Sequence, residues 1–173
     1  DFVHTHTWGA WTIDKDGHSR KCTQQQRNQR GVVYAIENEA SDHIYNADRI
    51  CTACGYDGNI IQLEDGTYEI YTPKGFVRFA EIVNGGETTA NAVLQNNISL
   101  ASVTAAPVGT TQNPYGGTFD GQGYTVTIKI ADAQSNNGLF GVANGAKIKN
   151  FTVDGSIAIN TSSKAEHVGA VVG

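Results

Sequence analysis

The sequence predicts a mainly β protein whose C-terminal part is the start of a right-handed parallel β-helix. Two observations indicate this fold. Short segments alternate apolar with polar residues as strands do, and 125–130 and 147–153 are the clearest of them. Glycine-rich corners also recur, because Gly138-Leu-Phe-Gly141 begins 31 residues before Gly169-Ala-Val-Val-Gly173. Repetition at a period of about 20–50 residues is typical of proteins that stack one turn of chain on the next.

A hairpin and a helix are expected ahead of these repeats. Asp65-Gly66 is a hairpin-turn signal between two strand-like segments, 60–63 and 67–71. Residues 74–83 carry apolar side chains at the spacing of one helical face, and the glycines after Asn84 predict the end of the helix. Because the first turn of a β-helix must be covered, we predict that this helix is its N-terminal cap.

Four segments resemble the GLUG-type repeats of bacterial cell-surface proteins. They read GTFDGQGYTV at 117–126, NGLFG at 137–141, IKNFTVDG at 148–155 and VGAVVG at 168–173. The resemblance extends over about residues 66–173. Proteins of this family are large, secreted and adhesin-like, and the repeats also occur in the non-catalytic flanks of IgA-protease-like enzymes.

The resemblance implies an extracellular location on a bacterial cell surface and a structural or adhesive role without catalysis. The implied partners are a host glycan or a host protein. The chain begins with Asp1 rather than methionine and ends within a glycine corner, so we expect a longer polypeptide beyond both ends. The alternative is that this is the non-catalytic N-terminal portion of a larger secreted carbohydrate-active enzyme or protease.

Composition divides the chain into two predicted domains, 1–58 and 59–173. Residues 1–58 hold all three cysteines and both tryptophans. The stretch from His4 to Cys22 resembles the small His/Trp/Cys modules repeated in clostridial surface proteins, whose usual form ends in Cys-x-x-Cys-Gly. We therefore predict a small zinc-ribbon-like module, followed by a domain that comprises the hairpin, the helix and the first turns of the β-helix.

The motif Cys51-Thr-Ala-Cys54 predicts a structural Zn²⁺ site, because two thiolates at this spacing can bind one tetrahedral zinc. Cys22 offers a third sulfur. His18 precedes Cys22 by four residues and is the first choice for the fourth ligand. The predicted ligands are therefore His18, Cys22, Cys51 and Cys54. The alternatives for the histidine are His6, then His4, and last His43.

Two other fates of the cysteines stay open, namely a disulfide with one free thiol, and three free thiols. Four protein ligands would leave no open position on the metal, so a catalytic zinc is not expected. Trp8 and Trp11 could stack on a sugar or a peptide, but a small module more often uses such residues as its core.

Three classes of function are disfavoured by the sequence. The net charge of −5 argues against nucleic-acid binding, which requires clustered Lys and Arg. Apolar runs fall short of the about 20 residues needed for membrane insertion. The carboxylates that a glycosidase would need are represented by Asp120, Asp132 and Asp154, and two of these precede a glycine as turn-capping residues do. We therefore predict that the chain is not an enzyme.

Overall fold

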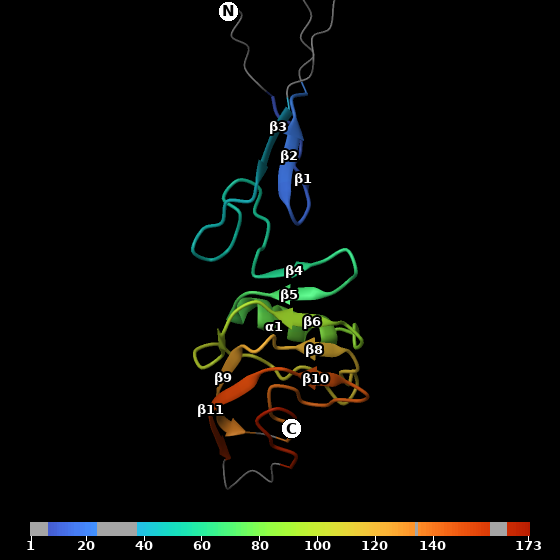
Figure 1. Cartoon of the computed structure of the whole chain (residues 1–173), viewed down its shortest axis with the longest axis vertical. Coiled ribbons are helices and arrows are strands. Elements are labelled where there is room, and N and C mark those ends of the chain that lie inside the picture. The colour runs from blue at the N-terminus through green and yellow to red at the C-terminus, as the bar shows by residue number, and fades with distance from the viewer. Residues whose placement is uncertain (1–6, 24–37, 134, 160–165) are drawn as a thin grey trace, which may run out of the picture. The chain divides into compact units, whose positions relative to one another are not determined.

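In the computed structural model, the chain divides into two compact units, Asp1–Gly58 and Asn59–Gly173, called unit 1 and unit 2 below. The structure describes residues 7–23, 38–133, 135–159 and 166–173. Strands predominate in both units, and the described residues contain one helix (Figure 1). The predicted mainly β fold with parallel sheets is confirmed.

Unit 1 contains a three-stranded antiparallel sheet in the order β1-β2-β3. The strands are β1 (Thr12–Ile13), β2 (Gly17–Lys21) and β3 (Asn38–Asp42). The central strand pairs His18 with Ile13 on one side and with Ser41 on the other. A Cβ atom on Gly17 would come within 2.6 Å of the Ser41 carbonyl oxygen. Glycine at this position therefore allows β3 to lie close against the start of β2.

Unit 2 contains two sheets, of which every strand pair but one is parallel. The five-stranded sheet has the order β10-β8-β6-β5-β4 and the three-stranded sheet the order β11-β9-β7. The exception is β4 with β5, which pair antiparallel around the turn at Asp65-Gly66. The bounds are β4 (Ile60–Gln62), β5 (Tyr68–Ile70), β6 (Ala92–Leu94), β7 (Ile98–Ser99), β8 (Thr118–Asp120), β9 (Thr125–Ala133), β10 (Lys147–Lys149) and β11 (Thr152–Ile159).

The helix α1 (Pro73–Asn84) lies between β5 and β6 in the chain. Its first turn is capped by Thr72, whose Oγ1 accepts the Gly75 N–H at 3.1 Å. Pro73 fits the first helical position, because a backbone N–H there would have no partner within the helix. At the other end the backbone enters the left-handed region at Gly86, with φ of +124°. The sequence predicted this helix over 74–83, one residue shorter at each end.

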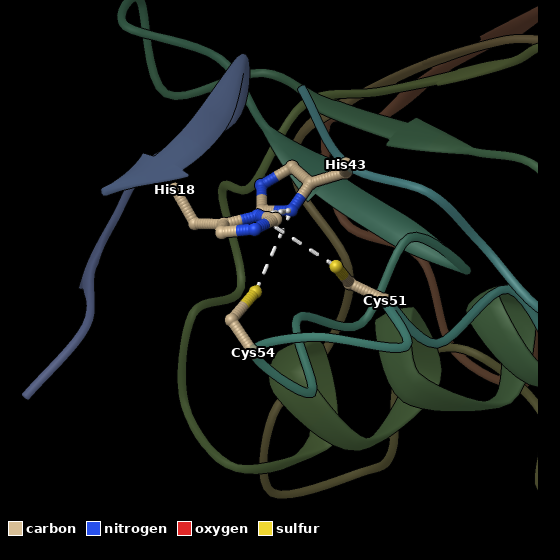
Figure 2. A group of neighbouring side chains, drawn as sticks. All are labelled: His18, His43, Cys51 and Cys54. Carbon is tan, nitrogen blue, oxygen red and sulfur yellow. Dashed lines mark hydrogen bonds between the residues drawn. The ribbon is translucent and has the colours of Figure 1, made fainter. Parts of the chain in front are cut away.

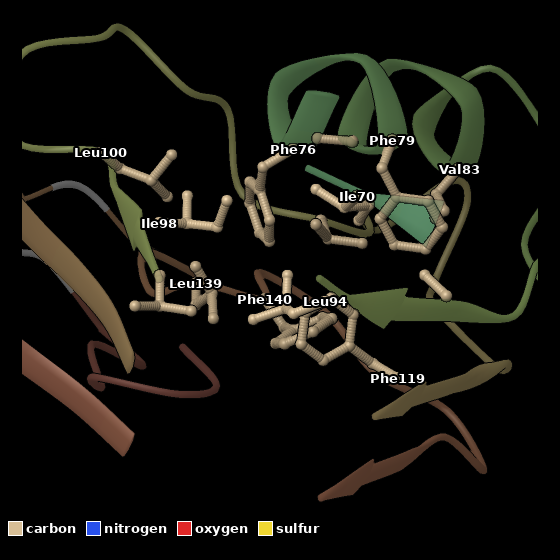
Figure 3. Packing of buried hydrophobic residues seen from close by; sticks show 14 of the residues in the cluster. Ile70, Phe76, Phe79, Val83, Leu94, Ile98, Leu100, Phe119, Leu139 and Phe140 are labelled. Atoms are coloured by element: carbon tan, nitrogen blue, oxygen red, sulfur yellow. The ribbon is translucent and has the colours of Figure 1, made fainter. Parts of the chain in front are cut away.

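The core of unit 2 is formed by α1 and the inward-facing residues of the strands. Figure 3 shows Phe76, Phe79 and Val83 reaching from α1 toward Ile70 and Leu94. Phe79 is fully buried, and its ring centroid lies 6.1 Å from that of Tyr68 and 6.2 Å from that of Phe119. Aromatic pairs at this spacing stabilise a core beyond their buried area.

Gly109 shows why glycines recur at the corners of unit 2. Its φ is +83°, and a Cβ atom would lie 2.2 Å from the Val142 carbonyl oxygen. Gly123 has nearly the same backbone angle, +84°, but nothing lies within 4 Å of a Cβ atom there. Gly109 is therefore required by both conformation and close approach, whereas Gly123 is favoured by conformation alone.

We predict that Gly109→Ala lowers the free energy of unfolding of unit 2 by more than Gly123→Ala does. Alanine at a left-handed position costs about 1–2 kcal/mol at either site. At Gly109 the methyl group also overlaps the backbone, which adds about 1–3 kcal/mol. Urea unfolding of the full chain, followed by far-UV circular dichroism, measures the difference, and equal losses in the two variants would contradict this prediction.

Asp120 caps a turn. Its Oδ1 accepts the Gln122 N–H at 2.9 Å and the Asn150 side-chain N–H at 3.1 Å, and its Oδ2 lies 3.0 Å from Lys149 Nζ. The hydrogen bond from Gln122 and the contact with Lys149 hold the pKa of Asp120 below its ordinary value. Asp154 accepts the N–H of Gly155 at 2.7 Å, and the Asp132 side chain lies outside the described residues.

The stability of unit 2 should depend on pH through Asp120. Because the folded-state pKa is depressed, the carboxylate stabilises the fold above the unfolded value of about 3.9, and this contribution is lost as the pH falls through the folded-state pKa. The melting temperature of Asp120→Asn should therefore lie below wild type at pH 7 and converge with it in acid. Lys149→Gln keeps both hydrogen bonds and should show a smaller difference. Parallel pH profiles for wild type and Asp120→Asn would exclude this role.

Candidate metal centre

Four side chains of unit 1, His18, His43, Cys51 and Cys54, bring their ligand atoms within 4.8 Å of one another. Figure 2 shows the two imidazole rings facing the two sulfur atoms. His18 comes from β2, His43 directly follows β3, and both cysteines belong to one turn. The group therefore joins three separate segments of the chain, and it could hold a metal ion.

The turn that carries the cysteines is closed by its own backbone. Gly55 N–H donates to the Cys51 carbonyl at 2.9 Å, and Cys51 N–H donates to the Tyr56 carbonyl at 2.8 Å. Gly55 adopts φ of +77°, which a residue with a side chain rarely does. This geometry presents both sulfur atoms to the histidines, as the sequence motif predicted.

The distances between the ligand atoms are short and similar. His18 Nδ1 lies 3.4 Å from His43 Nδ1 and 3.7 Å from Cys51 Sγ. His43 Nδ1 lies 3.6 Å from Cys54 Sγ. The same nitrogen of each ring, Nδ1, therefore faces the other ligands, and each is close to one sulfur.

The other nitrogen of each ring is hydrogen-bonded. His43 Nε2 lies 2.7 Å from the Asp14 carbonyl oxygen, and His18 Nε2 lies 3.2 Å from Ser41 Oγ. A carbonyl oxygen can only accept, so the proton of His43 resides on Nε2 and the lone pair of Nδ1 is available to a metal. Such outer hydrogen bonds normally accompany histidine ligands, because they fix the tautomer and the ring orientation.

Aromatic side chains hold both rings. Trp11 meets the His18 ring edge-on at 4.5 Å between centroids, and Tyr56 stacks on His43 at 4.4 Å with the planes 7° apart. The guanidinium of Arg20 lies 4.3 Å from the Trp11 ring and 4.9 Å from the Trp8 ring. Both tryptophans are half-buried, so the structure favours a packing role for them over an open platform for a sugar.

Burial and electrostatics differ between the four candidates. Cys51 and His18 are 2% and 6% exposed, whereas His43 and Cys54 are half-buried. Burial opposes ionisation of Cys51, but the backbone N–H groups of Cys54 and Ala53 and the nearby His43 imidazole together outweigh it and lower the pKa of Cys51 to about 6. Burial raises the pKa of Cys54.

His43 itself is shifted by two opposing effects. Burial is the largest single effect and lowers its pKa, but the hydrogen bond to the Asp14 carbonyl and the neighbouring Cys51 together outweigh burial, and the net pKa lies above the ordinary value. A metal would have to displace protons from both cysteines and from any imidazolium present. Metal affinity at this group should therefore increase with pH.

The structure brings together three of the predicted ligands and places His43 where Cys22 was expected. Cys22 is not in the group. The reason is that β2 is extended and rises about 3.3 Å per residue, which separates His18 from Cys22 by about 13 Å. Four residues are a compact ligand spacing on a helix but not on a strand.

Cys22 instead lies buried at 4% exposure, at an isolated bridge with Trp8. All three cysteines are free thiols in the structure, so no disulfide joins them. His4 and His6, the first alternatives for the histidine, lie outside the described residues. His43 was the last choice from the sequence. An extended strand over residues 17–22 would have excluded Cys22 from the ligand set of His18 and favoured a ligand from another segment of the chain.

Comparison with family models, with curated proteins and with solved structures gave no match for this chain. Among the described residues, α1 is too short and too polar to cross a bilayer.

Proposed function

We propose that the chain is a non-catalytic module of a bacterial cell surface, with a structural or adhesive role. In this proposal a structural zinc ion holds unit 1 together, and unit 2 begins a right-handed parallel β-helix that is capped by α1. The single observation that carries the zinc proposal is the convergence of His18, His43, Cys51 and Cys54.

Three of the distances between the ligand atoms of these residues match those of a tetrahedral zinc site. Bonds of about 2.0–2.1 Å to nitrogen and about 2.3 Å to sulfur, at tetrahedral angles, separate two nitrogens by about 3.3–3.4 Å and a nitrogen from a sulfur by about 3.6 Å. The corresponding distances here are 3.4 Å between the Nδ1 atoms, and 3.6 and 3.7 Å from nitrogen to sulfur. Two thiolates would also neutralise Zn²⁺, so that the buried complex carries no net charge.

A structural role for the metal follows from what else unit 1 buries. Among its described residues, the apolar side chains classed as buried are Cys22 and Cys51. A sheet with so little apolar burial is poorly stabilised by packing, and metal binding can then supply most of the folding free energy. Four protein ligands complete a tetrahedron, which favours a structural over a catalytic zinc.

We expect one zinc ion per chain in the purified protein, and its loss in Cys54→Ser and in His43→Ala. Cys22→Ser is the matched control, because it changes a buried cysteine outside the group and should keep the metal. Elemental analysis gives the stoichiometry, and the cobalt-substituted spectrum reports two thiolate ligands. Tryptophan fluorescence follows unit 1 alone, since both tryptophans belong to it, and a chelator should lower its melting temperature.

The outcome also separates the two ligand sets. Zinc loss in Cys22→Ser together with retention in His43→Ala would restore the set predicted from the sequence. A wild-type chain that binds no zinc and has the same melting temperature with and without chelator would contradict the proposed structural zinc site.

The β-helix proposal for unit 2 is supported by a repeating offset in strand pairing. Tyr68 pairs in parallel with Ala92, Ala92 with Phe119, and Phe119 with Ile148, at offsets of 24, 27 and 29 residues. In the second sheet Ile98 pairs with Val126 and Val126 with Val153, at offsets of 28 and 27. Pairing that advances by one nearly constant interval in two sheets is what a coil of stacked turns requires.

Asparagine side chains form hydrogen bonds across the same interval in the sequence. Asn91 Oδ1 accepts the N–H of Thr118, and Asn97 Oδ1 accepts the N–H of Thr125, both at 2.9 Å. Each bond joins a corner to the chain about one turn later and satisfies a backbone N–H group. These bonds, together with the glycine corners, support the proposed β-helix, whereas the surface role is inferred from the sequence resemblance to GLUG-type repeats alone.

The adhesive role predicts binding without turnover. We expect the full chain to retain at least one host glycan or extracellular protein on an array, and to leave that ligand chemically intact by mass spectrometry. Repeating the array with metal-stripped chain shows whether unit 1 or unit 2 carries the binding. Absence of binding would leave only the spacer role, whereas cleavage of the ligand would contradict a non-catalytic module.

A further inference from the structure

The segment from Asp14 to His18 supplies more to the metal group than one ligand. It contributes His18 itself, and the Asp14 carbonyl holds His43 from the side opposite the sulfurs. The segment from Asp14 to His18 therefore carries one imidazole, that of His18, and contacts the other, that of His43.

The position of that carbonyl is set by the side chain of the same residue. Asp14 Oδ1 accepts the N–H of Asp16 at 2.9 Å and the N–H of Gly17 at 3.0 Å. The backbone N–H of Asp14 donates to the Gly17 carbonyl at 3.1 Å, which closes the turn. A carboxylate that accepts two backbone N–H groups stabilises a turn of this kind against its alternatives.

We propose that the carboxylate of Asp14 is a positioning group for the metal centre. It folds the turn that directs the Asp14 carbonyl at His43 Nε2, and so holds His43 as the Nε2–H tautomer with Nδ1 toward the metal. The role of Asp14 toward a metal rests on the zinc proposal above, whereas its effect on the His43 ring does not.

The other contacts of His43 leave this task to Asp14. Stacking on Tyr56 fixes the plane of the ring, but a half-turn of the ring about its bond to Cβ keeps that plane and exchanges the nitrogens with carbons. The bond from Nε2 to the carbonyl distinguishes the two orientations. His18 differs, because Ser41 Oγ can donate or accept and therefore does not fix a tautomer.

The test uses the full chain with three substitutions. Asp14→Ala removes both acceptor bonds and should weaken Co²⁺ affinity about 10–100-fold, the usual effect of losing an outer partner of a metal-bound histidine. Asp14→Asn keeps an oxygen that can accept both bonds and should restore affinity to near that of wild type. Asp16→Ala is the control, because the Asp16 side chain is exposed and its ion pair is with Lys15. Chelator competition gives the affinities.

A second readout reports the ring directly and needs no metal. Long-range ¹⁵N–¹H spectra of the imidazoles should show His43 protonated on Nε2 in metal-free wild type at high pH, and a mixture of tautomers in Asp14→Ala. A merely structural contribution of Asp14 would lower the melting temperature without changing this ratio.

The proposal is overturned if Asp14→Ala binds Co²⁺ as tightly as wild type, if Asp14→Asn is as weak as Asp14→Ala, or if wild-type His43 carries its proton on Nδ1. Should Asp14→Ala fail to fold, the wild-type tautomer and the affinity of Asp14→Asn still decide. A wild-type chain that binds no metal contradicts the zinc proposal, and the tautomer then decides separately whether Asp14 orients His43.

Discussion

Backbone pairing between β2 and β3 is the interaction on which the metal group of unit 1 depends. The register sets His18 opposite Ser41. His43 follows two residues after Ser41, and its Nδ1 lies 3.4 Å from that of His18. Gly17 permits this approach, because a side chain there would meet the Ser41 carbonyl. The described residues of unit 1 bury few apolar side chains, so hydrogen bonding is the main interaction that brings the two imidazoles together among them. The Asp14 turn adds a further hydrogen bond, to the second imidazole.

Unit 2, by contrast, is stabilised mainly by the burial of apolar side chains. Its large side chains, among them Phe79, Tyr115 and Phe119, are fully buried in one aromatic-rich cluster. Parallel pairing at nearly constant offset stacks inward residues of successive segments over one another, and α1 covers part of that cluster. Burial on this scale stabilises a fold without a metal. Under the zinc proposal the two units differ in what holds them together, and removal of the metal should affect unit 1 far more than unit 2.

Local patterns predicted the elements of unit 2 well, and they predicted the metal group only in part. Alternation at 125–130 and the turn at Asp65-Gly66 correspond to β9 and to the β4–β5 pair, because both signals act within a few residues. The Cys51–Cys54 turn is local in the same sense. The histidines are not, since their meeting depends on the register of β2 with β3, which no short-range pattern encodes. The spacing along the sequence predicted Cys22 as a ligand, but the extended strand places that residue too far from His18 to share a metal with it.

The arrangement of the sulfurs bears on the choice between a metal and a disulfide. A bond between Cys51 and Cys54 would close a loop of only four residues, which the loop-closure model values at about 2 kcal/mol. It would tie no second segment to the turn, and it would leave both Nδ1 atoms facing sulfurs that can no longer bind anything. A metal bound by all four atoms would instead join β2, the end of β3 and the cysteine turn. The outer bonds to Asp14 and Ser41 orient both imidazoles, an orientation that a metal would require and a disulfide would not.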